Sequence, residues 1–360
     1  MLLLIPPQLY TQIYYHILLL VLLGLVIQLI STDIQNMKSI GAVSLIGYLL
    51  FVGVTLYLGL RPNPRAYGDS YFYGHSFEMQ RLGLVQYRSS DWAFSAFLKF
   101  STSTMTLEQF FLAIDIIYVV PCFIFSKKYF KTYWFYAFFM FVGSFSFFSY
   151  GTNGLRNGMA TALFIFALCF YERKWLMFII MYIAIGIHAS ILIPLIGFVV
   201  ALFYSNTKYI LIAWLCFIPL SLVSGGVWES LFSGFIDDGR SAYLGQGNID
   251  TQTVRGFRWD FILYSAMGIF AGYYFIIKEK FTEKFYVHLY NTFVIANGFW
   301  ILVIRANYSN RIAYLSWFLM APVIIYPMVK MKFWKNQNVV LASVISIYYL
   351  FTYFMLVIKG

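Results

Sequence analysis

Apolar runs long enough to cross a lipid bilayer recur from one end of this chain to the other. Each is about 15–22 residues long, and a helix needs roughly 20 residues to span the hydrocarbon. Only 11% of the residues are charged, compared with roughly 25% in soluble domains. The pattern predicts an all-α polytopic membrane protein with about 11–12 transmembrane or re-entrant helices, and one integral membrane domain over residues 1–360.

The apolar runs also predict where the membrane helices lie. We expect them near residues 9–30, 40–60, 106–126, 132–150, 157–171, 175–188, 190–204, 209–223, 260–277, 286–304, 311–329 and 338–358. The region 175–204 has to be a pair of short helices or a re-entrant element. A single long helix there would reverse the side of the membrane on which every later loop lies.

Lysine and arginine are distributed differently over the predicted loops. Basic clusters lie at 127–131, 172–174, 278–284 and 330–335, and the positive-inside rule places such clusters in the cytoplasm. With that orientation, 12 of the 14 lysines are cytoplasmic, whereas 10 of the 11 arginines lie on the opposite side and only Arg173 does not. The lysines follow the rule, so the arginines need another explanation.

The outward-facing arginines suit an anionic substrate at the membrane surface. A guanidinium is planar and permanently charged, and it binds phosphate or carboxylate through two parallel hydrogen bonds. A lipid-linked pyrophosphate is the natural candidate. For any one arginine the alternative is contact with lipid headgroups, but that role would not select arginine over lysine so consistently. Arg156 stands out because its Gly/Asn-rich turn has no acid nearby in the sequence.

The first of three predicted outer segments is an extracytoplasmic loop over residues 61–105. It contains a short polar and aromatic cluster that includes Asp69 and Tyr73. An interfacial helix is expected to follow from Asp91, which is a candidate N-cap residue. The alternative for Asp69 is a simple turn residue after Gly68.

The second segment is a large extracytoplasmic loop over residues 224–259, too polar to span a membrane and too long for a simple connector. This loop and the residue after it supply Arg240, Tyr243, Arg258 and Asp260. Carboxylates accept hydrogen bonds from hydroxyl groups, and aromatic faces pack on the apolar face of a sugar ring. The segment is therefore predicted to bind a glycan; the alternative is a solvated loop with its aromatic residues in the interface belt.

The third segment is the hairpin from Arg305 to Arg311, with two arginines in seven residues. A further candidate is His188, at the predicted outer break between two short helices. Its imidazole can take up a proton near neutral pH, which makes it a candidate base. The alternative for His188 is a structural group with satisfied hydrogen bonds.

Several common catalytic patterns are missing from the sequence. It has no Walker A, GxSxG, HExxH or CxxC motif, and no D-x-D carboxylate pair of the kind that often holds a metal and a nucleotide diphosphate. A nucleotide-sugar mechanism is therefore disfavoured. We expect no cofactor, no metal and no nucleic-acid partner.

Five stretches, taken in their order along the chain, resemble the EpsG family. These are the Wzy-type polymerases of bacterial exopolysaccharide and O-antigen assembly. Arg61 ends a helix and is followed by GDSYFYGHSF; the other stretches are LRNGMATALFIFAL, IAIGIHASILIPL, DDGRSAYL and NRIAYLSWFLMAPVIIYP. The resemblance covers roughly residues 50 to 330. It departs from the family at one point, because members often have Arg-Gln where this chain has Arg156-Asn157.

The resemblance implies a helical membrane glycosyltransferase of the GT-C-like kind that uses polyprenyl-linked donors. It implies a multi-pass protein of the bacterial cytoplasmic membrane with its active site on the outer face. There the growing glycan would leave undecaprenyl pyrophosphate and join the non-reducing-end hydroxyl of an incoming lipid-linked oligosaccharide repeat unit. The implied partners are these repeat units and membrane lipid; a chain-length regulator protein is left open.

This chemistry gives the candidate residues their roles. Fixed guanidinium groups would stabilise the departing pyrophosphate, and Arg156 would lack an acid partner because its partner is the substrate. The predicted sites are catalytic His188 and Asp69; pyrophosphate-binding Arg156, Arg311, Arg61 and Arg305; and glycan-binding Arg240, Tyr243, Arg258, Asp260 and Tyr73.

Rival functions remain at this point. A flippase of lipid-linked sugars would suit the helices and arginines, but it should show internal repeats and a polar midplane pathway, and the sequence has no convincing repeat. Asp115 lies within a predicted span without an identifiable basic partner. An O-antigen ligase would share the donor and the arginines, and an O-acyltransferase or a non-catalytic assembly protein are further alternatives.

Overall fold

The computed structural model describes residues 5–32, 37–62, 67–85, 87, 89–224, 226–228, 231, 256–306 and 309–359. Over these residues the chain is helical and contains no strand. Six helical segments are long and apolar enough to cross a membrane: 9–31, 40–59, 107–142, 259–278, 309–330 and 337–358. Four shorter apolar helices accompany them in the described part of the chain. The predicted all-α, multi-pass membrane fold is confirmed.

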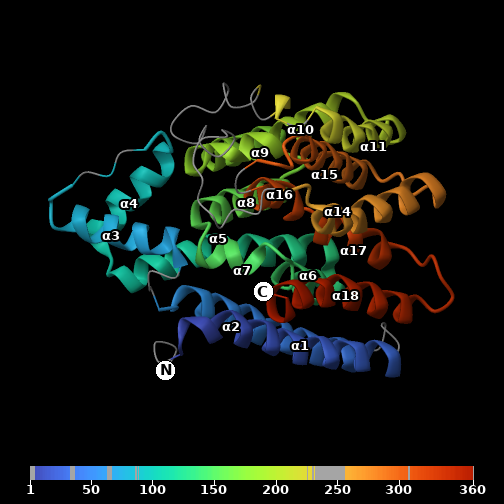
Figure 1. Cartoon of the computed structure of the whole chain (residues 1–360). Helices are drawn as coiled ribbons and strands as arrows, with labels where there is room; N and C mark the ends of the chain where they lie inside the picture. The colour runs from blue at the N-terminus through green and yellow to red at the C-terminus, as the bar shows by residue number, and fades with distance from the viewer. Residues whose placement is uncertain are drawn as a thin grey trace. The chain divides into compact units, whose positions relative to one another are not determined.

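The chain divides into two compact units, residues 1–191 with 328–360 and residues 192–327. The predicted single domain over residues 1–360 stays a prediction. In the first unit (Figure 1), α1 (Pro7–Ser31) packs against α18 (Gln337–Tyr353), and α2 (Met37–Gly59) packs against α5 (Leu107–Phe130). A hydrogen bond joins the first of these pairs, since the Tyr349 hydroxyl of α18 donates to the carbonyl of Tyr15 in α1.

Two helices occupy the predicted outer loop 61–105, at one end of the first unit (cyan in Figure 1). The first, α3 (Asp69–Arg81), was not predicted. It begins after Gly68, whose φ of 47° lies in the left-handed region that glycine tolerates best. The second, α4 (Trp92–Thr104), lies where the interfacial helix is expected, and its place at the membrane interface stays a prediction. It buries Phe94 and Leu98, while Trp92 and Phe100 remain exposed.

The predicted span 132–150 is divided rather than continuous. It consists of α6 (Trp134–Val142) and α7 (Phe147–Thr152), with a turn over residues 143–146 between them. A Gly154 N-cap then starts α8 (Leu155–Leu168), which packs on both α5 and α9 (Lys174–Ile187). The predicted break near 188 is confirmed, because α9 ends at an extended His188 and a short turn, η4 (Ala189–Ile191), follows.

The second unit contains α10 (Leu192–Phe203), α11 (Thr207–Val223), α14 (Trp259–Gly272), α15 (Lys284–Leu302), α16 (Ser309–Trp317) and most of α17 (Met320–Lys330). Helix α15 lies against α10, α11 and α16. Its Asn297 amide is buried, donates to Ser265 and Ser316, and accepts from the Trp214 indole at 2.8 Å. These bonds satisfy a polar group that would otherwise be costly inside an apolar bundle.

At α8 and at α15, lysine and arginine lie at opposite ends of the helix. In the first unit, Lys128 donates to the carbonyl of Cys169 at the end of α8, whereas Arg156 lies in the first turn of that helix. In the second unit, α15 runs from Lys284 to a turn that carries Arg305. The predicted separation of the two cations is thus present in both units, while the assignment of one end to the cytoplasm stays a prediction.

Gly272 gives a direct test of packing in the second unit. A Cβ atom there would lie 1.9 Å from the Tyr290 ring, which is fully buried and donates from its hydroxyl to Ile269. We expect Gly272→Ala to lower the free energy of unfolding in detergent by about 1–3 kcal/mol, because the ring cannot move without breaking that bond. Gly24→Ala is the control, since a Cβ atom at Gly24 would meet nothing within 4 Å. Equal thermal stability of the two variants would contradict this packing.

Candidate functional site

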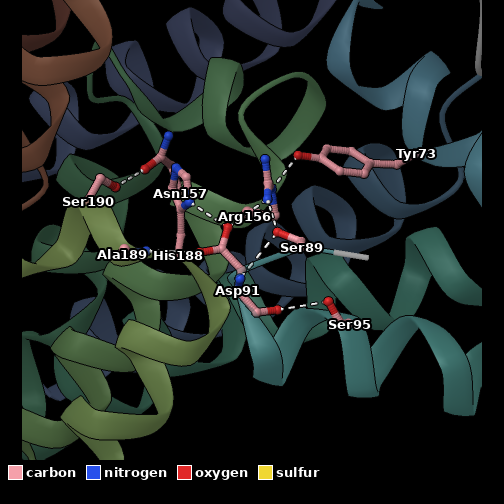
Figure 2. A network of polar contacts seen from close by, with 9 residues as sticks. All are labelled: Tyr73, Ser89, Asp91, Ser95, Arg156, Asn157, His188, Ala189 and Ser190. Atoms are coloured by element: carbon pink, nitrogen blue, oxygen red, sulfur yellow. Dashed lines mark hydrogen bonds and ion pairs between the residues drawn. The ribbon is translucent and has the colours of Figure 1, made fainter. Parts of the chain in front are cut away.

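Arg156 is the charged centre of a polar cluster at one end of the first unit (Figure 2). It is the second residue of α8, where the helix dipole disfavours a cation and favours an anion. The helix itself therefore gives no reason for an arginine at this position. Its Nε donates to the Tyr73 hydroxyl at 2.5 Å, and its Cζ lies 5.4 and 5.7 Å from the ring centroids of Tyr73 and Phe94.

Asp91 is the acid that meets Arg156. The guanidinium Nη1 donates to the Asp91 Oδ2 at 2.6 Å, and it also lies 3.4 Å from the Ser89 hydroxyl. The Asp91 side chain is only 1% exposed, compared with 21% for Arg156. Within the described part of the chain, Nη2 of Arg156 has no hydrogen-bond partner. Nε and Nη1 of the guanidinium are thus held inside the cluster, and the side chain still reaches the surface.

His188 completes the cluster from the break between α9 and α10. Its Nδ1 lies 3.0 Å from the same Asp91 Oδ2 that accepts from Arg156. The Asp91 Oδ1 accepts a bond of 3.3 Å from the backbone N–H of Ala189, which fixes the start of the next turn. On the adjoining face, the Ser190 hydroxyl donates to the Asn157 Oδ1 at 2.5 Å. One buried carboxylate therefore joins the N-terminus of α8 to the break after α9.

A second ion pair lies behind this cluster and supports it. Arg61 donates from Nη1 to the Asp115 Oδ2 at 2.6 Å, and the two side chains are 1% and 0% exposed. Its Nη2 donates to Ser70, whose hydroxyl donates in turn to the carbonyl of Thr152. This chain of bonds links the end of α2, helix α5, the start of α3 and the turn before α8.

Helix α3 connects the two ion pairs. Ser70 and Tyr73 are three residues apart and therefore share one face of the helix, so that one contacts Arg61 and the other Arg156. The N–H of Asp69 donates to the side chain of Asn153 at 2.8 Å, which fastens α3 to the turn before α8. Burial raises the pKa of Tyr73 well above its ordinary value, and Arg156 lowers it only in part, so that its hydroxyl stays protonated at neutral pH.

The structure corrects the interpretation of three residues in the sequence. Arg156 does have an acid partner, although that acid lies 65 residues earlier in the chain. Asp91 does precede α4 as the predicted N-cap residue, but its side chain makes no capping bond because both its oxygens are engaged elsewhere. Asp115 also has the basic partner that the sequence did not reveal, Arg61.

A comparison with protein-family models identifies the chain. The model of the EpsG family matches residues 44–360, most of the sequence. The chain belongs to the EpsG family. Members of this family are polysaccharide polymerase-like membrane proteins, which confirms the resemblance drawn from the sequence. No curated protein and no solved structure matches the chain, and the GT-C-like relationship stays a prediction.

The family match covers all the residues of the cluster, and the structure brings together only some of the predicted ones. In this EpsG-family protein, Arg156 and His188 both contact Asp91, and Tyr73 contacts Arg156 (Figure 2). Asp69 lies one turn of α3 before Tyr73. Arg61 is in the buried pair behind the cluster, which leaves its guanidinium 1% exposed. The functional roles of these residues remain predictions.

The other candidates belong to the second unit. Arg258 and Asp260 pair with each other through two bonds of 2.9 and 2.8 Å at the start of α14. Arg305 is exposed, with its guanidinium 5.9 Å from the Phe257 ring centroid, and Arg311 lies in the first turn of α16. Arg240 and Tyr243 lie outside the described residues.

The side chains of the cluster are suited to proton transfer and anion binding. No group of three or more histidine, cysteine, aspartate or glutamate side chains in the described part of this EpsG-family protein could hold a metal ion. The expectation that the protein works without a metal stays a prediction. Arg156 and His188 both contact the Asp91 carboxylate, so that a permanent cation lies next to a titratable imidazole.

Proposed function

We propose that this EpsG-family protein is a glycan polymerase that uses a polyprenyl-pyrophosphate-linked donor. The growing glycan would leave undecaprenyl pyrophosphate and join the non-reducing-end hydroxyl of an incoming lipid-linked repeat unit. We further propose that this takes place at the outer face of the bacterial cytoplasmic membrane, with lipid and lipid-linked repeat units as partners and without a metal. The proposed reaction does not require a chain-length regulator protein.

The observation that carries the proposal is the partly exposed guanidinium of Arg156 next to His188. In the proposed step, the acceptor hydroxyl oxygen forms a bond to the anomeric carbon of the donor. The bond between that carbon and the pyrophosphate oxygen breaks, and its electron pair leaves with the pyrophosphate. Arg156 stabilises the negative charge that develops there, and His188 accepts the proton of the attacking hydroxyl.

The remaining candidates have supporting roles in this proposal. The Tyr73 hydroxyl accepts from the Arg156 Nε at 2.5 Å and helps to hold the guanidinium in place, and Tyr73 is kept as a glycan-binding residue. Arg61 acts from behind the site through α3 and not on the pyrophosphate. Asp69 is kept as the alternative base, and Arg305 and Arg311 as further pyrophosphate ligands. Arg240, Tyr243, Arg258 and Asp260 are kept as glycan-binding residues.

Deletion of the gene in its own strain tests the proposal. We expect the surface glycan to shrink from long chains to single repeat units on a gel, because export and attachment continue without polymerisation. Wild-type protein should restore the long chains, and His188→Gln should not. Loss of all surface glycan with lipid-linked repeats trapped inside would show a flippase, and long chains left on undecaprenyl pyrophosphate would show a ligase. Either of these outcomes would overturn the proposal.

A further inference from the structure

Asp91 has no assigned role, yet it is the residue that joins the proposed anion site to the proposed base. Its Oδ2 lies 2.6 Å from the Arg156 Nη1 and 3.0 Å from the His188 Nδ1. Its Oδ1 accepts from the N–H of Ala189. A carboxylate that is 1% exposed and bound by three elements is held in one position. Arg156 and His188 therefore share a single oxygen atom whose place is fixed.

The charge balance of the cluster gives this shared contact a consequence. Arg156 carries one positive charge and Asp91 one negative charge, so the resting pair is neutral. A neutral pair attracts pyrophosphate less strongly than a lone guanidinium would, because the substrate has to compete with a carboxylate already in place. Binding of an anion to Arg156 weakens the hydrogen bond from its Nη1 to the Asp91 Oδ2. That oxygen then interacts chiefly with His188.

We propose that Asp91 is a positioning residue that couples occupation of Arg156 by a polyprenyl pyrophosphate to the readiness of His188 to accept a proton. The inference rests on the proposed function. With Asp91 as acceptor, His188 carries a hydrogen on Nδ1 and presents the lone pair of Nε2 as the base. A stronger bond from Nδ1–H to an oxygen released by Arg156 stabilises the imidazolium that forms when Nε2 takes the hydroxyl proton.

The coupling predicts that Asp91→Asn changes binding and turnover in opposite directions. Without the competing carboxylate, Arg156 should bind undecaprenyl pyrophosphate at least about 5-fold more tightly. Without the negative charge next to Nδ1, the kcat of chain extension should fall by about 100-fold or more. A merely structural aspartate would weaken both. The control is Glu108→Gln, which removes an exposed carboxylate from the first turn of α5 and should change neither.

The experiment uses the full chain in nanodiscs of phosphatidylcholine, with undecaprenyl pyrophosphate as the probe and undecaprenol, which lacks the phosphates, as its control. Tighter probe binding together with a lower kcat in Asp91→Asn supports the proposal. Weaker probe binding, or an unchanged kcat, overturns it.

A second measurement needs no variant of Asp91 and so remains decisive if Asp91→Asn does not fold. The ¹⁵N signal of the His188 Nδ1, assigned with His188→Gln, is recorded before and after addition of the probe. We expect the probe to shift this signal in the wild type and not in Arg156→Ala, and undecaprenol to shift it in neither. An unchanged wild-type signal overturns the coupling. Failure of the wild type to extend chains, with the signal shift present, would instead count against the proposed function alone.

Discussion

Replacement of Asp115 by alanine is expected to lower the free energy of unfolding by about 3–5 kcal/mol. The substitution leaves the Arg61 guanidinium buried at 1% exposure without a counter-charge. Water cannot compensate for this loss, because the surrounding side chains include the Phe111 ring, 4.8 Å from the Arg61 Cζ. Thermal and denaturant unfolding of the purified protein in detergent would measure the change.

Two comparisons separate the cost of the unpaired charge from the loss of a contact. The double variant Arg61→Met with Asp115→Leu removes both charges, and we expect it to recover much of the stability lost in Asp115→Ala. Arg258→Ala breaks a pair whose side chains are 23% and 26% exposed, and it should cost no more than about 1 kcal/mol. A double variant as unstable as Asp115→Ala would show that the pair contributes by packing and not through its charges.

The second large effect is expected at Arg156. Arg156→Ala should lower chain extension roughly 100- to 1000-fold, the usual cost of removing one donor that stabilises a developing negative charge. Arg156→Lys should recover little, because the guanidinium bonds Tyr73 through Nε and Asp91 through Nη1 at the same time. A lysine ammonium is a single point charge on a flexible stem and cannot reproduce that fork. Polymerisation of lipid-linked repeat units in membranes is the measurement.

Arg173→Lys is the matched control for this substitution. It makes the same change in the basic turn that follows α8, where Arg173 is exposed, and it should leave polymerisation unchanged. Full activity of Arg156→Lys would mean that a positive charge alone is enough and that the two directed bonds are not needed. Equal losses in both variants would point to a general effect of lysine on assembly.

The overall class of the fold could be predicted from the sequence because the apolar runs are long and frequent. The break at His188 could be predicted as well, since the sidedness of the basic loops requires an even number of crossings there. Helix α3 could not, because its polar and aromatic sequence lacks a clear apolar period, and its helix is held by Ser70 and Tyr73 contacts to distant residues. Long-range contacts of this kind leave no local pattern.

The candidate site could be predicted only as separate halves. Arg156 and His188 stand out in the sequence as polar groups next to apolar helices. Their common partner does not, because an aspartate that precedes a helix already has an ordinary explanation as an N-cap residue. The pairing of Arg61 with Asp115 could not be predicted either, because the two residues are 54 positions apart in the sequence. A buried acid in an apolar helix is a signal that some basic group lies nearby, but it does not say which one.

The length of α8 has a consequence for how a lipid-linked substrate would be reached. Fourteen residues rise about 21 Å, which is roughly 9 Å less than the hydrocarbon thickness of about 30 Å. If the basic turn after α8 lies at one headgroup layer, Arg156 lies roughly 9 Å below the opposite one. Irregular backbone at such a depth is tolerated where it is covered by protein, as the turn before α8 is by α3. A polyprenyl pyrophosphate would then bring its headgroup inward along the protein while its isoprenoid tail stays in the lipid.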